Sequence, residues 1–455
     1  MSELKAYPEY KDSGVEWIGE IPRRWNVSKL KYLASIETGN TPPKSDENNY
    51  IDGIYPWVKP DNINDDYTIS DTKEKLSEQG VKLARLIPEN SALVCCIGTV
   101  GKVGVNNTKV TTNQQINSII FNKKLWNSIY GLYSTISAQQ EYVKNSNKVV
   151  VSILNKNTQE NIKMPLPSEK EQEKIGEFIK VKTSEIDNLI ADKERLIELL
   201  EEKRQAVITE TVTKGLDPNV KMKDSGIEWI GEVPEHWDIT KIKYTTYVKG
   251  RIGWQGLRSD EFKEEGNYYL VTGTDFNNGY INWSECNRIS ETRYLEAPEI
   301  HLKNGDILIT KDGTIGKIAL VDNKPKFATL NSGVFVTRPL KNNEYHNKYM
   351  YWLLNSDVFK DFVDMKTGGT TIKHLYQDTL INYQFPFPPY NEQMAIAEEI
   401  NNYITEADLL LNLIKNQITK LKEYHESLIY EAVTGKIDVR DYATEKKKRT
   451  REEEL

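Results

Sequence analysis

Cysteine is scarce in this sequence: Cys95, Cys96 and Cys286 are the only three among 455 residues. Three cysteines, two of them adjacent within an apolar run, do not make a disulfide framework, so we expect reduced thiols in a cytoplasmic protein. Histidine is also sparse, and none of the 5 histidines stands at metal-ligand spacing from a cysteine or a carboxylate. We therefore expect no metal site.

Long apolar runs and an excess of positive charge are missing as well. No stretch of about 18 consecutive apolar residues occurs, which predicts no membrane span. Residues 1–5 lack the apolar segment of a secretory signal. The net charge is −7, which excludes a protein that is basic over its whole surface. It does not exclude nucleic-acid binding, because that needs only a local basic face.

One stretch of the sequence occurs twice. Residues 11–32 read KDSGVEWIGEIPRRWNVSKLKY and residues 223–244 read KDSGIEWIGEVPEHWDITKIKY, so 14 of 22 positions are identical. Most of the other positions are conservative exchanges. The chain is also too long for one ordinary hydrophobic core. The sequence therefore predicts an internal duplication with at least two domains.

The first half is followed by a stretch with the features of a long helix. Pro165 and Pro167 end the half, Ser168 and Glu171 form a capping-box pattern, and Gly215 supplies a C-terminal cap signal. Between these signals, apolar residues recur at heptad spacing. The apolar positions are Ile175, Ile179, Ile186, Leu189, Leu196, Leu200 and Val207, with Lys182, Lys193 and Lys203 at the remaining heptad positions.

The second half ends in the same way, with a proline-rich stop at residues 386–389 and a helical stretch from about Asn391 to Val433. Its heptad positions are Ile396, Ile400, Tyr403, Ala407, Leu410, Ile414, Gln417, Leu421, Tyr424 and Leu428. A single amphipathic helix is marginal in water, so we expect the two helices to pack on each other. The duplication favours an antiparallel pair, related by a pseudo-two-fold axis, with the globular halves at opposite ends.

These signals predict an α+β fold with two mixed α/β domains and two long antiparallel helices that form a coiled coil. The predicted boundaries are residues 1–165 for the first domain, 166–217 for the first long helix, 218–385 for the second domain, 386–438 for the second long helix and 439–455 for a charged, disordered tail.

The repeat follows the N-terminus in one half and the end of a long helix in the other. If the halves are pseudo-symmetric, Lys11 should lie near Asp438, as Lys223 lies near Asp217. The repeat would then join each domain to the helix pair. We interpret the two tryptophans of each copy, Trp17 and Trp25 in the first and Trp229 and Trp237 in the second, as structural anchors of this joint.

Motifs for catalysis are weak. The loops at residues 98–102 and 313–317 both read Gly-Thr-x-Gly-Lys, but they lack the glycine spacing of a P-loop and the Ser or Thr that follows its lysine. We expect tight β-turns there. Phe387-Pro388-Pro389-Tyr390 comes close to the base-pocket motif of amino-group methyltransferases, but Phe387 has no side-chain acceptor. These absences fit a chain that does not itself catalyse a reaction.

Three motifs that occur twice carry a resemblance to a known family. They are D-S-G-x-E-W-I-G-E-x-P-x-x-W at the start of each half, P-x-P-x-x-x-E-Q-x-x-I at the start of each helix, and E-x-V-T-x-x-x-D at residues 210–217 and 431–438. In this order the chain resembles the specificity subunit of type I restriction-modification enzymes, a bacterial defence system. The resemblance implies two target recognition domains that each read one half of a bipartite, asymmetric DNA site. It also implies that the helices set the spacing between the half-sites.

The resemblance further implies partners and cofactors. The partners would be double-stranded DNA, two methyltransferase subunits docked on the helices, and restriction subunits that translocate DNA. S-adenosylmethionine, ATP and Mg²⁺ would be carried by those subunits, and this chain would hold no cofactor. Two alternatives remain at this point: a self-sufficient DNA methyltransferase and a coiled-coil adaptor that does not bind DNA.

Candidate DNA contacts are loop residues whose side chains match base edges or phosphates. In the first domain they are Lys59, Asn62, Thr99, Lys102, Asn113, Gln114, Gln115, Ser152, Asn155 and Lys156. In the second domain they are Arg251, Trp254, Thr272, Lys311, Thr314, Lys317, Asn331, Thr370, Thr371 and Lys373.

Overall fold

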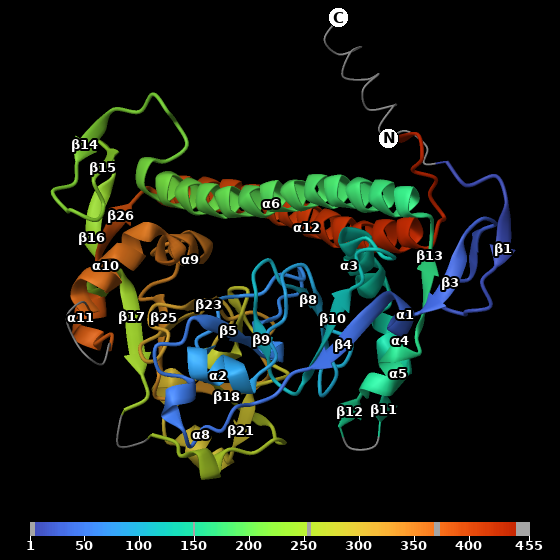
Figure 1. Ribbon diagram of the computed structural model, residues 1–455. Helices are drawn as coiled ribbons and strands as arrows, with labels where there is room; N and C mark the ends of the chain where they lie inside the picture. Colours follow the sequence, from blue (N-terminus) through green and yellow to red (C-terminus); the bar gives the residue numbers. More distant parts are fainter. Residues whose placement is uncertain (1–4, 149–150, 253–255, 368–373, 443–455) are drawn as a thin grey trace, which may run out of the picture. The chain divides into compact units, whose positions relative to one another are not determined.

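The computed structural model describes residues 5–148, 151–252, 256–367 and 374–442. The chain forms two compact units: unit 1 contains residues 1–193 and 416–455, and unit 2 contains residues 194–415. Two long helices, α6 (Glu169–Lys214) and α12 (Tyr390–Val433), therefore each contribute one part to each unit (Figure 1). The mixed α/β fold with two long helices is confirmed. The predicted domain boundaries stay a prediction, since the compact units divide within both helices.

Unit 1 is built on a four-stranded antiparallel sheet with strand order β4-β10-β7-β8. Its central strand β7 is apolar at all four positions and completely buried, as a strand covered on both faces should be. In a second sheet, β5 pairs antiparallel with β6 and parallel with β9. The bounds are β4 Ala34–Thr38, β5 Tyr55–Val58, β6 Lys75–Leu76, β7 Ala92–Cys95, β8 Val103–Val105, β9 Thr111–Thr112 and β10 Ile116–Phe121.

Unit 2 repeats this arrangement. Its six-stranded sheet has the order β17-β25-β22-β23-β20-β19, and its three-stranded sheet β21-β18-β24 contains a parallel pair, β18 with β24. The first four strands of the larger sheet and this parallel pair match unit 1 in topology. The bounds are β17 Thr246–Gly250, β18 Tyr268–Val271, β19 Phe276–Asn277, β20 Tyr280–Ile281, β21 Asn287–Ile289, β22 Ile307–Thr310, β23 Ile318–Leu320, β24 Phe327–Leu330 and β25 Val334–Pro339.

Short elements complete each unit. In unit 1 they are β1 Tyr10–Asp12, β2 Glu20–Pro22, β3 Asn26–Lys29, α1 Leu30–Leu33, α2 Glu78–Leu83, α3 Ser128–Ser137, α4 Gln139–Lys144, β11 Asn147–Lys148, β12 Ser152–Ile153, α5 Lys156–Glu160 and β13 Lys163–Leu166. In unit 2 they are β14 Met222–Asp224, β15 Glu232–Pro234, β16 Asp238–Lys241, α7 Ile242–Thr245, α8 Glu291–Leu295, α9 Asn347–Asn355, α10 Asp357–Thr367, α11 Gln377–Ile381 and β26 Gln384–Phe387.

Within each unit, α6 and α12 lie antiparallel. In unit 1 the Lys193 ammonium donates to the Gln417 side chain at 2.7 Å, and in unit 2 Arg204 pairs with Asp408 at 2.9 Å. Both helices end at a glycine with a positive φ, Gly215 and Gly435, as the C-cap signal predicts. The predicted antiparallel pairing is thus present in each unit.

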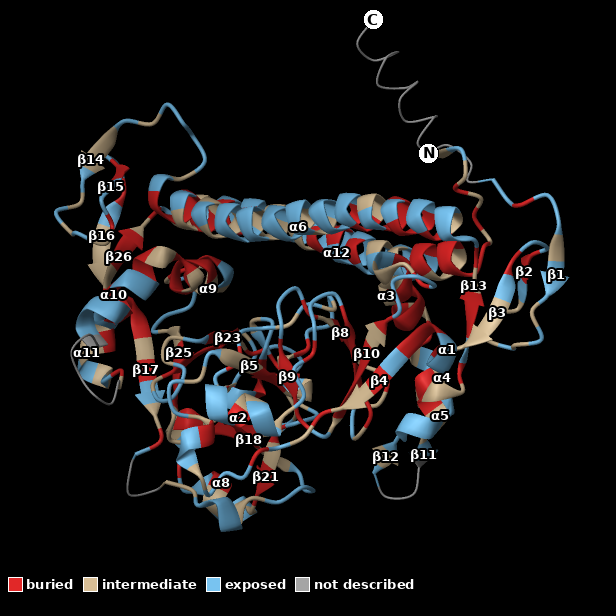
Figure 2. Cartoon of the chain, in the orientation of Figure 1, coloured by how far each residue is buried: buried red, intermediate tan, exposed pale blue. Residues whose placement is uncertain are grey.

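The predicted heptad register is wrong in part. Leu189 and Leu196 on α6, and Leu410 on α12, are more than 40% exposed, whereas Leu411 and Ile418 are buried instead. Buried positions on α12 recur at the helical period of 3.6 rather than 3.5, because a straight helix rotates away from a strict heptad by about 20° per repeat. Figure 2 shows α6 exposed along most of its length, with buried residues toward its two ends.

The sequence repeat joins each domain to the end of a long helix, as predicted. In unit 1 the Tyr10 hydroxyl donates to the Gly435 carbonyl (3.0 Å), the Tyr430 hydroxyl donates to the Trp17 carbonyl (2.8 Å), and the Asp438 amide donates to the Lys5 carbonyl (2.7 Å). In both units the second tryptophan is buried and its indole donates to a helix glutamate. The pairs are Trp25 with Glu171 and Trp237 with Glu392.

The same joint closes through a buried tyrosine in each unit. The Tyr130 hydroxyl lies 3.1 Å from the Val433 carbonyl and 3.3 Å from the Pro165 carbonyl, and Tyr349 makes the same two contacts with Val212 and Pro386. A tyrosine buried in an apolar core needs such a partner for its hydroxyl. In each half, one tyrosine hydroxyl on a domain helix thereby contacts both the end of one long helix and the strand that precedes the other long helix.

Two smaller predictions can be compared with the structure. The Gly-Thr-x-Gly-Lys loops are tight turns that connect β7 to β8 and β22 to β23, and all four of their glycines have positive φ. The predicted tail begins later than residue 439, because Val439 is buried and the Tyr442 ring packs on Phe178 in unit 1. Residues 443–455 lie outside the described part of the chain. Among the described residues, no helix is long and apolar enough to cross a membrane.

Candidate nucleic-acid interface

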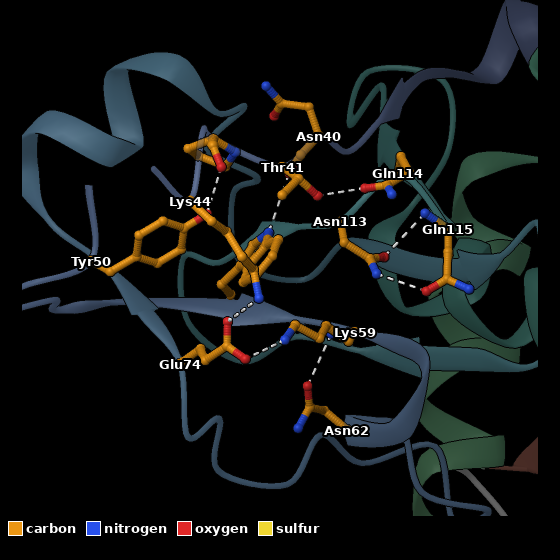
Figure 3. A network of polar contacts seen from close by, with 12 residues as sticks. Asn40, Thr41, Lys44, Tyr50, Lys59, Asn62, Glu74, Asn113, Gln114 and Gln115 are labelled. Atoms are coloured by element: carbon orange, nitrogen blue, oxygen red, sulfur yellow. Dashed lines mark hydrogen bonds and ion pairs between the residues drawn. The ribbon is translucent and has the colours of Figure 1, made fainter. Parts of the chain in front are cut away.

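The parallel strand pair of unit 1 gathers polar side chains at one edge. Trp57 on β5 lies opposite Thr111 on β9, and Val58 lies opposite Thr112, so the residues that follow both strands leave at the same end. The loop after β4 joins them, since the Asn40 amide donates to the Thr112 carbonyl at 3.0 Å. We call this group the unit 1 edge: Asn40, Thr41, Lys44, Lys59, Asn62, Glu74, Asn113, Gln114 and Gln115 (Figure 3).

Two lysines and one glutamate surround Trp57 at this edge. The ammonium groups of Lys59 and Lys44 lie 4.5 Å and 5.9 Å from the centre of the indole. Glu74 bridges them, at 2.6 Å from Lys59 and 3.7 Å from Lys44. The hydrogen bond from Lys59 lowers the pKa of the Glu74 carboxyl, which therefore stays ionised at neutral pH. One carboxylate against two ammonium groups leaves the edge locally positive.

Amide side chains at the edge are held in defined orientations. The Thr41 hydroxyl donates to the Gln114 carbonyl oxygen at 2.6 Å, and the side chains of Asn113 and Gln115 are joined at 2.9 Å. The Asn62 oxygen caps the Lys59 backbone amide at 2.9 Å. Gln114 is exposed, so its amide nitrogen and second lone pair remain available to a base edge. Glutamine in this state matches the paired donor and acceptor of adenine.

Gly39 holds the loop of the unit 1 edge against β9. A Cβ atom at Gly39 would lie 2.2 Å from the Asn113 carbonyl oxygen and 2.3 Å from that of Thr112. These are backbone atoms, so no side chain can rotate aside. Glycine is required here by close approach of two backbones.

We expect Gly39→Ala to destabilise unit 1 by about 1–3 kcal/mol, the usual penalty of overpacking, and to displace Asn40 and Thr41 from the edge. Chemical denaturation measures the first effect, and DNA affinity of the assembled complex measures the second. Gly333→Ala is the control, because its Cβ would meet nothing closer than 3.8 Å. Equal stability of the two variants would contradict the role of Gly39.

A hollow of about 400 Å³ adjoins the unit 1 edge. It is lined by Lys44, Glu47, Tyr50, Ile51, Lys73, Glu74 and Lys75. Three lysines against two glutamates make its rim basic. Such a surface can accept phosphate oxygens of a nucleic-acid backbone.

Other candidates of unit 1 lie around the β7–β8 turn and the start of α5. Lys102 pairs with Asp65 at 3.3 Å, Thr99 is exposed on the turn, and the Ser152 carbonyl accepts from the Gly98 amide at 3.1 Å. Asn155 caps α5, and Lys156 lies 3.9 Å from Glu160. These residues lie outside the edge group, so the sequence list combined more than one surface.

Unit 2 builds the same edge with different side chains. Thr272 follows β18 and its amide is capped by Asp275 at 2.7 Å, as Lys59 is capped by Asn62 in unit 1. Asn331 follows β24, and its amide donates to the Val271 carbonyl at 2.9 Å. Lys311 joins them through a 2.9 Å backbone hydrogen bond to Gly333.

Arg251 lies beneath this edge and does not face solvent. It is 1% exposed, and its Nε donates to the Leu330 carbonyl at 2.9 Å. Burial lowers the pKa of its guanidinium, and Nη1 has no partner among the described residues. Asn113 of unit 1 is also buried. Both side chains support loops from inside the domain in this conformation.

The remaining unit 2 candidates divide into two groups. Lys317 is exposed but its ammonium is engaged by the Phe276 carbonyl at 2.8 Å, while Thr314 is exposed on the β22–β23 turn. Trp254, Thr370, Thr371 and Lys373 lie outside the described residues. None of the candidate contacts is tested by the fold itself, so the contacts stay predictions.

The list made from the sequence missed part of the unit 1 edge. Asn40 and Thr41 belong to the polar loop Gly39-Asn40-Thr41-Pro42-Pro43, which was visible in the sequence, and Lys44 directly follows it. Glu74 carried no signal, because it reaches Lys59 only through the pairing of β5 with β6. A further signal was the turn that follows β5 and β18. In these turns Asn62 and Asp275 cap the backbone amide three residues earlier, that of Lys59 and Thr272 respectively.

The fold defines the class of protein: a duplicated scaffold that carries two similar domains with different polar edges, each joined to a shared pair of long helices. A family described as Type I restriction modification DNA specificity domain matches residues 22–200 and 254–420. The chain belongs to this family. It is a sequence-specific DNA-recognition subunit that works in a complex with other subunits, and it is not the catalytic component.

Curated relatives agree with this assignment, and solved structures share the fold. The chain is 24% identical over 436 residues to the type I restriction enzyme MjaVIII specificity subunit of Methanocaldococcus jannaschii, covering 92% of this chain and 95% of the relative. It is similar to the HsdS subunit from Thermoanaerobacter tengcongensis, with a TM-score of 0.52, 15% identity and coverage of 92% and 98%. A solved structure of a type I restriction-modification system reaches a TM-score of 0.68 at 15% identity, covering 92% and 99%.

Proposed function

We propose that the edges of unit 1 and unit 2 each read one half of a bipartite, asymmetric DNA site. One observation carries this proposal: the same backbone edge presents Lys59 and Gln114 in unit 1 but Thr272 and Ser332 in unit 2. Base readout depends on side-chain donors and acceptors, so different side chains on one backbone frame select different bases.

The charge variant with the clearest expected effect is Lys44→Ala. Loss of one phosphate contact should weaken binding to all sequences and reduce the slope of log K against log salt by about 1. Lys123→Ala is the control, because Lys123 follows the opposite end of β10.

Gln114→Ala should instead relax the preference at one base pair by about 1–3 kcal/mol with little change in the salt slope. Competition binding of duplexes to the assembled complex at several salt concentrations measures both. Equal effects of Lys44→Ala and Lys123→Ala would contradict the phosphate assignment.

We further propose that the partners are two methyltransferase subunits, which carry S-adenosylmethionine, and restriction subunits, which carry ATP and Mg²⁺. This chain would then bind no cofactor itself. Exposed apolar side chains on the helices support docking there: Leu196, Leu199, Leu409 and Leu413 in unit 2 are between 43% and 73% exposed. Three buried free thiols fit a reducing cytoplasm.

Equilibrium dialysis of the isolated chain with S-adenosylmethionine separates this proposal from a self-sufficient methyltransferase. We expect no binding by the isolated chain and binding by the assembled complex. Tight binding by the isolated chain would refute the proposed division of labour.

A further inference from the structure

The structure explains most of the identities between the two repeat copies. Asp12 and Asp224 each accept from the backbone amide two residues later at 2.9 Å, which forms a turn in each copy. Trp17 and Trp229 donate to the backbone carbonyls of Lys163 and Gln384. The repeat glycines have positive φ, and Trp25 and Trp237 are buried. These positions are alike because the joint is alike.

The identical pair Tyr32 and Tyr244 has no such explanation. Tyr32 and Tyr244 close the two copies, and they are 63% and 64% exposed. Their rings contribute to no core. A single exposed tyrosine needs no special account, because folded proteins expose much apolar surface. The notable fact is that the exposed tyrosine recurs in both halves.

The lysine before each tyrosine recurs as well, with the same geometry. Lys31 lies 5.4 Å from the centre of the Tyr32 ring, and Lys243 lies 5.2 Å from that of Tyr244. A nearby asparagine pairs with a different lysine of the repeat in each unit. In unit 1 Lys29 donates to Asn161, and in unit 2 Lys243 donates to Asn382, both at 3.2 Å. Each unit thus presents an amphipathic tyrosine framed by positive charge.

Two other exposed positions of the repeat differ between the copies. Arg23 corresponds to Glu235, a reversal of charge, and Arg24 corresponds to His236. Exposed substitutions usually change stability by less than about 0.5 kcal/mol, so folding does not preserve an exposed residue. A ligand shared by both halves does. That ligand must be the same in both units, unlike the half-sites, which face different side chains.

We infer that the Tyr–Lys patches, Lys31 with Tyr32 and Lys243 with Tyr244, each bind one copy of the same protein subunit through a pocket with acidic groups at its rim. Tyrosine is enriched among the residues that dominate binding energy at protein interfaces. The bases of duplex DNA are stacked, so DNA offers no base face to these rings, whereas a protein pocket can enclose one. The inference rests on the proposed function, which supplies the subunit present in two copies, the methyltransferase subunit.

Native mass spectrometry of the full chain with the methyltransferase subunit of its own system tests the inference. The unmodified chain should bind two copies. Tyr32→Ala should weaken one binding event about 30-fold or more, as truncation of a dominant interface residue does, and leave a complex with one copy. Tyr244→Ala should do the same, and the double variant should bind neither copy. Tyr376→Ala is the matched control, because Tyr376 is 65% exposed but has no counterpart in the other half.

Two results would overturn the inference. One is a double variant that still binds two copies at the affinity of the unmodified chain. The other is a double variant with unchanged stoichiometry whose DNA affinity and salt slope both fall, which would make the patches phosphate contacts. Failure of the unmodified chain to bind the methyltransferase subunit would instead refute the proposed partner and, with it, the occupant of the patches. Circular dichroism of each variant confirms that folding is unaffected.

Discussion

Trp25→Ala should destabilise unit 1 by about 3–5 kcal/mol, because it removes a buried aromatic side chain and leaves a cavity. Trp25 is completely buried, packs edge-on against Tyr7 and hydrogen-bonds Glu171 at the start of α6. A domain stabilised by only 5–15 kcal/mol loses a large share of its stability in this way. Chemical denaturation measures the loss, and amide hydrogen exchange should locate it in the repeat and in the last turns of α12.

Trp237, the counterpart of Trp25 in the second repeat copy, provides a matched variant in unit 2. Trp237→Ala should act equally on unit 2, since its indole donates to Glu392 at 2.8 Å. Tyr32→Ala, in the same repeat but exposed, should leave stability within about 0.5 kcal/mol. A Trp25→Ala protein that folds normally yet fails to assemble with its methyltransferase would show that Trp25 serves binding rather than folding.

Insertion of one heptad into both α6 and α12 should change the spacer length that the complex prefers. Seven helical residues add about 10 Å, which corresponds to about 3 base pairs of duplex. If the helices set the distance between the two edges, affinity for the original spacer should fall by about 10-fold or more. A library of duplexes with graded spacer lengths measures the preference.

The site of insertion matters for this test. Insertions after Lys193 and before Gln417 extend both helices at the same level, because these two residues contact each other in unit 1. If α6 is extended without α12, the Lys193–Gln417 and Arg204–Asp408 contacts can no longer form at the same time, so the insertion should lower stability instead. An unchanged spacer preference in the double insertion would refute the role of the helices as a ruler.

The joint between domain and helix was the most predictable part of this protein. The prediction that Lys11 lies near the end of the second helix needed only the duplication and the position of each copy in the chain. Tyr10 contacts Gly435 as expected. The candidate site was less predictable, because its members converge from β4, β5, β6 and β9. Lys59 and Gln114 were found from loop chemistry, but their partners Glu74 and Thr41 were not.

Burial of charged and polar candidates could not be read from the sequence at all. Arg251 and Lys311 both follow strands and both carry a positive charge, yet Arg251 is buried and Lys311 is not. The heptad pattern shows the same limit, since Leu410 fits the pattern and is exposed while Leu411 is buried. Spacing along one helix does not record the rotation at which its partner meets it.

By itself the sequence determined the duplication, the two long helices with their caps, and the joint, because these depend on local signals and on the repeat of one motif. Only the tertiary structure decided which side chains share an edge and which face solvent. Those properties arise from strand pairing between segments far apart in the chain, such as β5 with β9 and β18 with β24. A contact between distant segments leaves no mark in either segment alone.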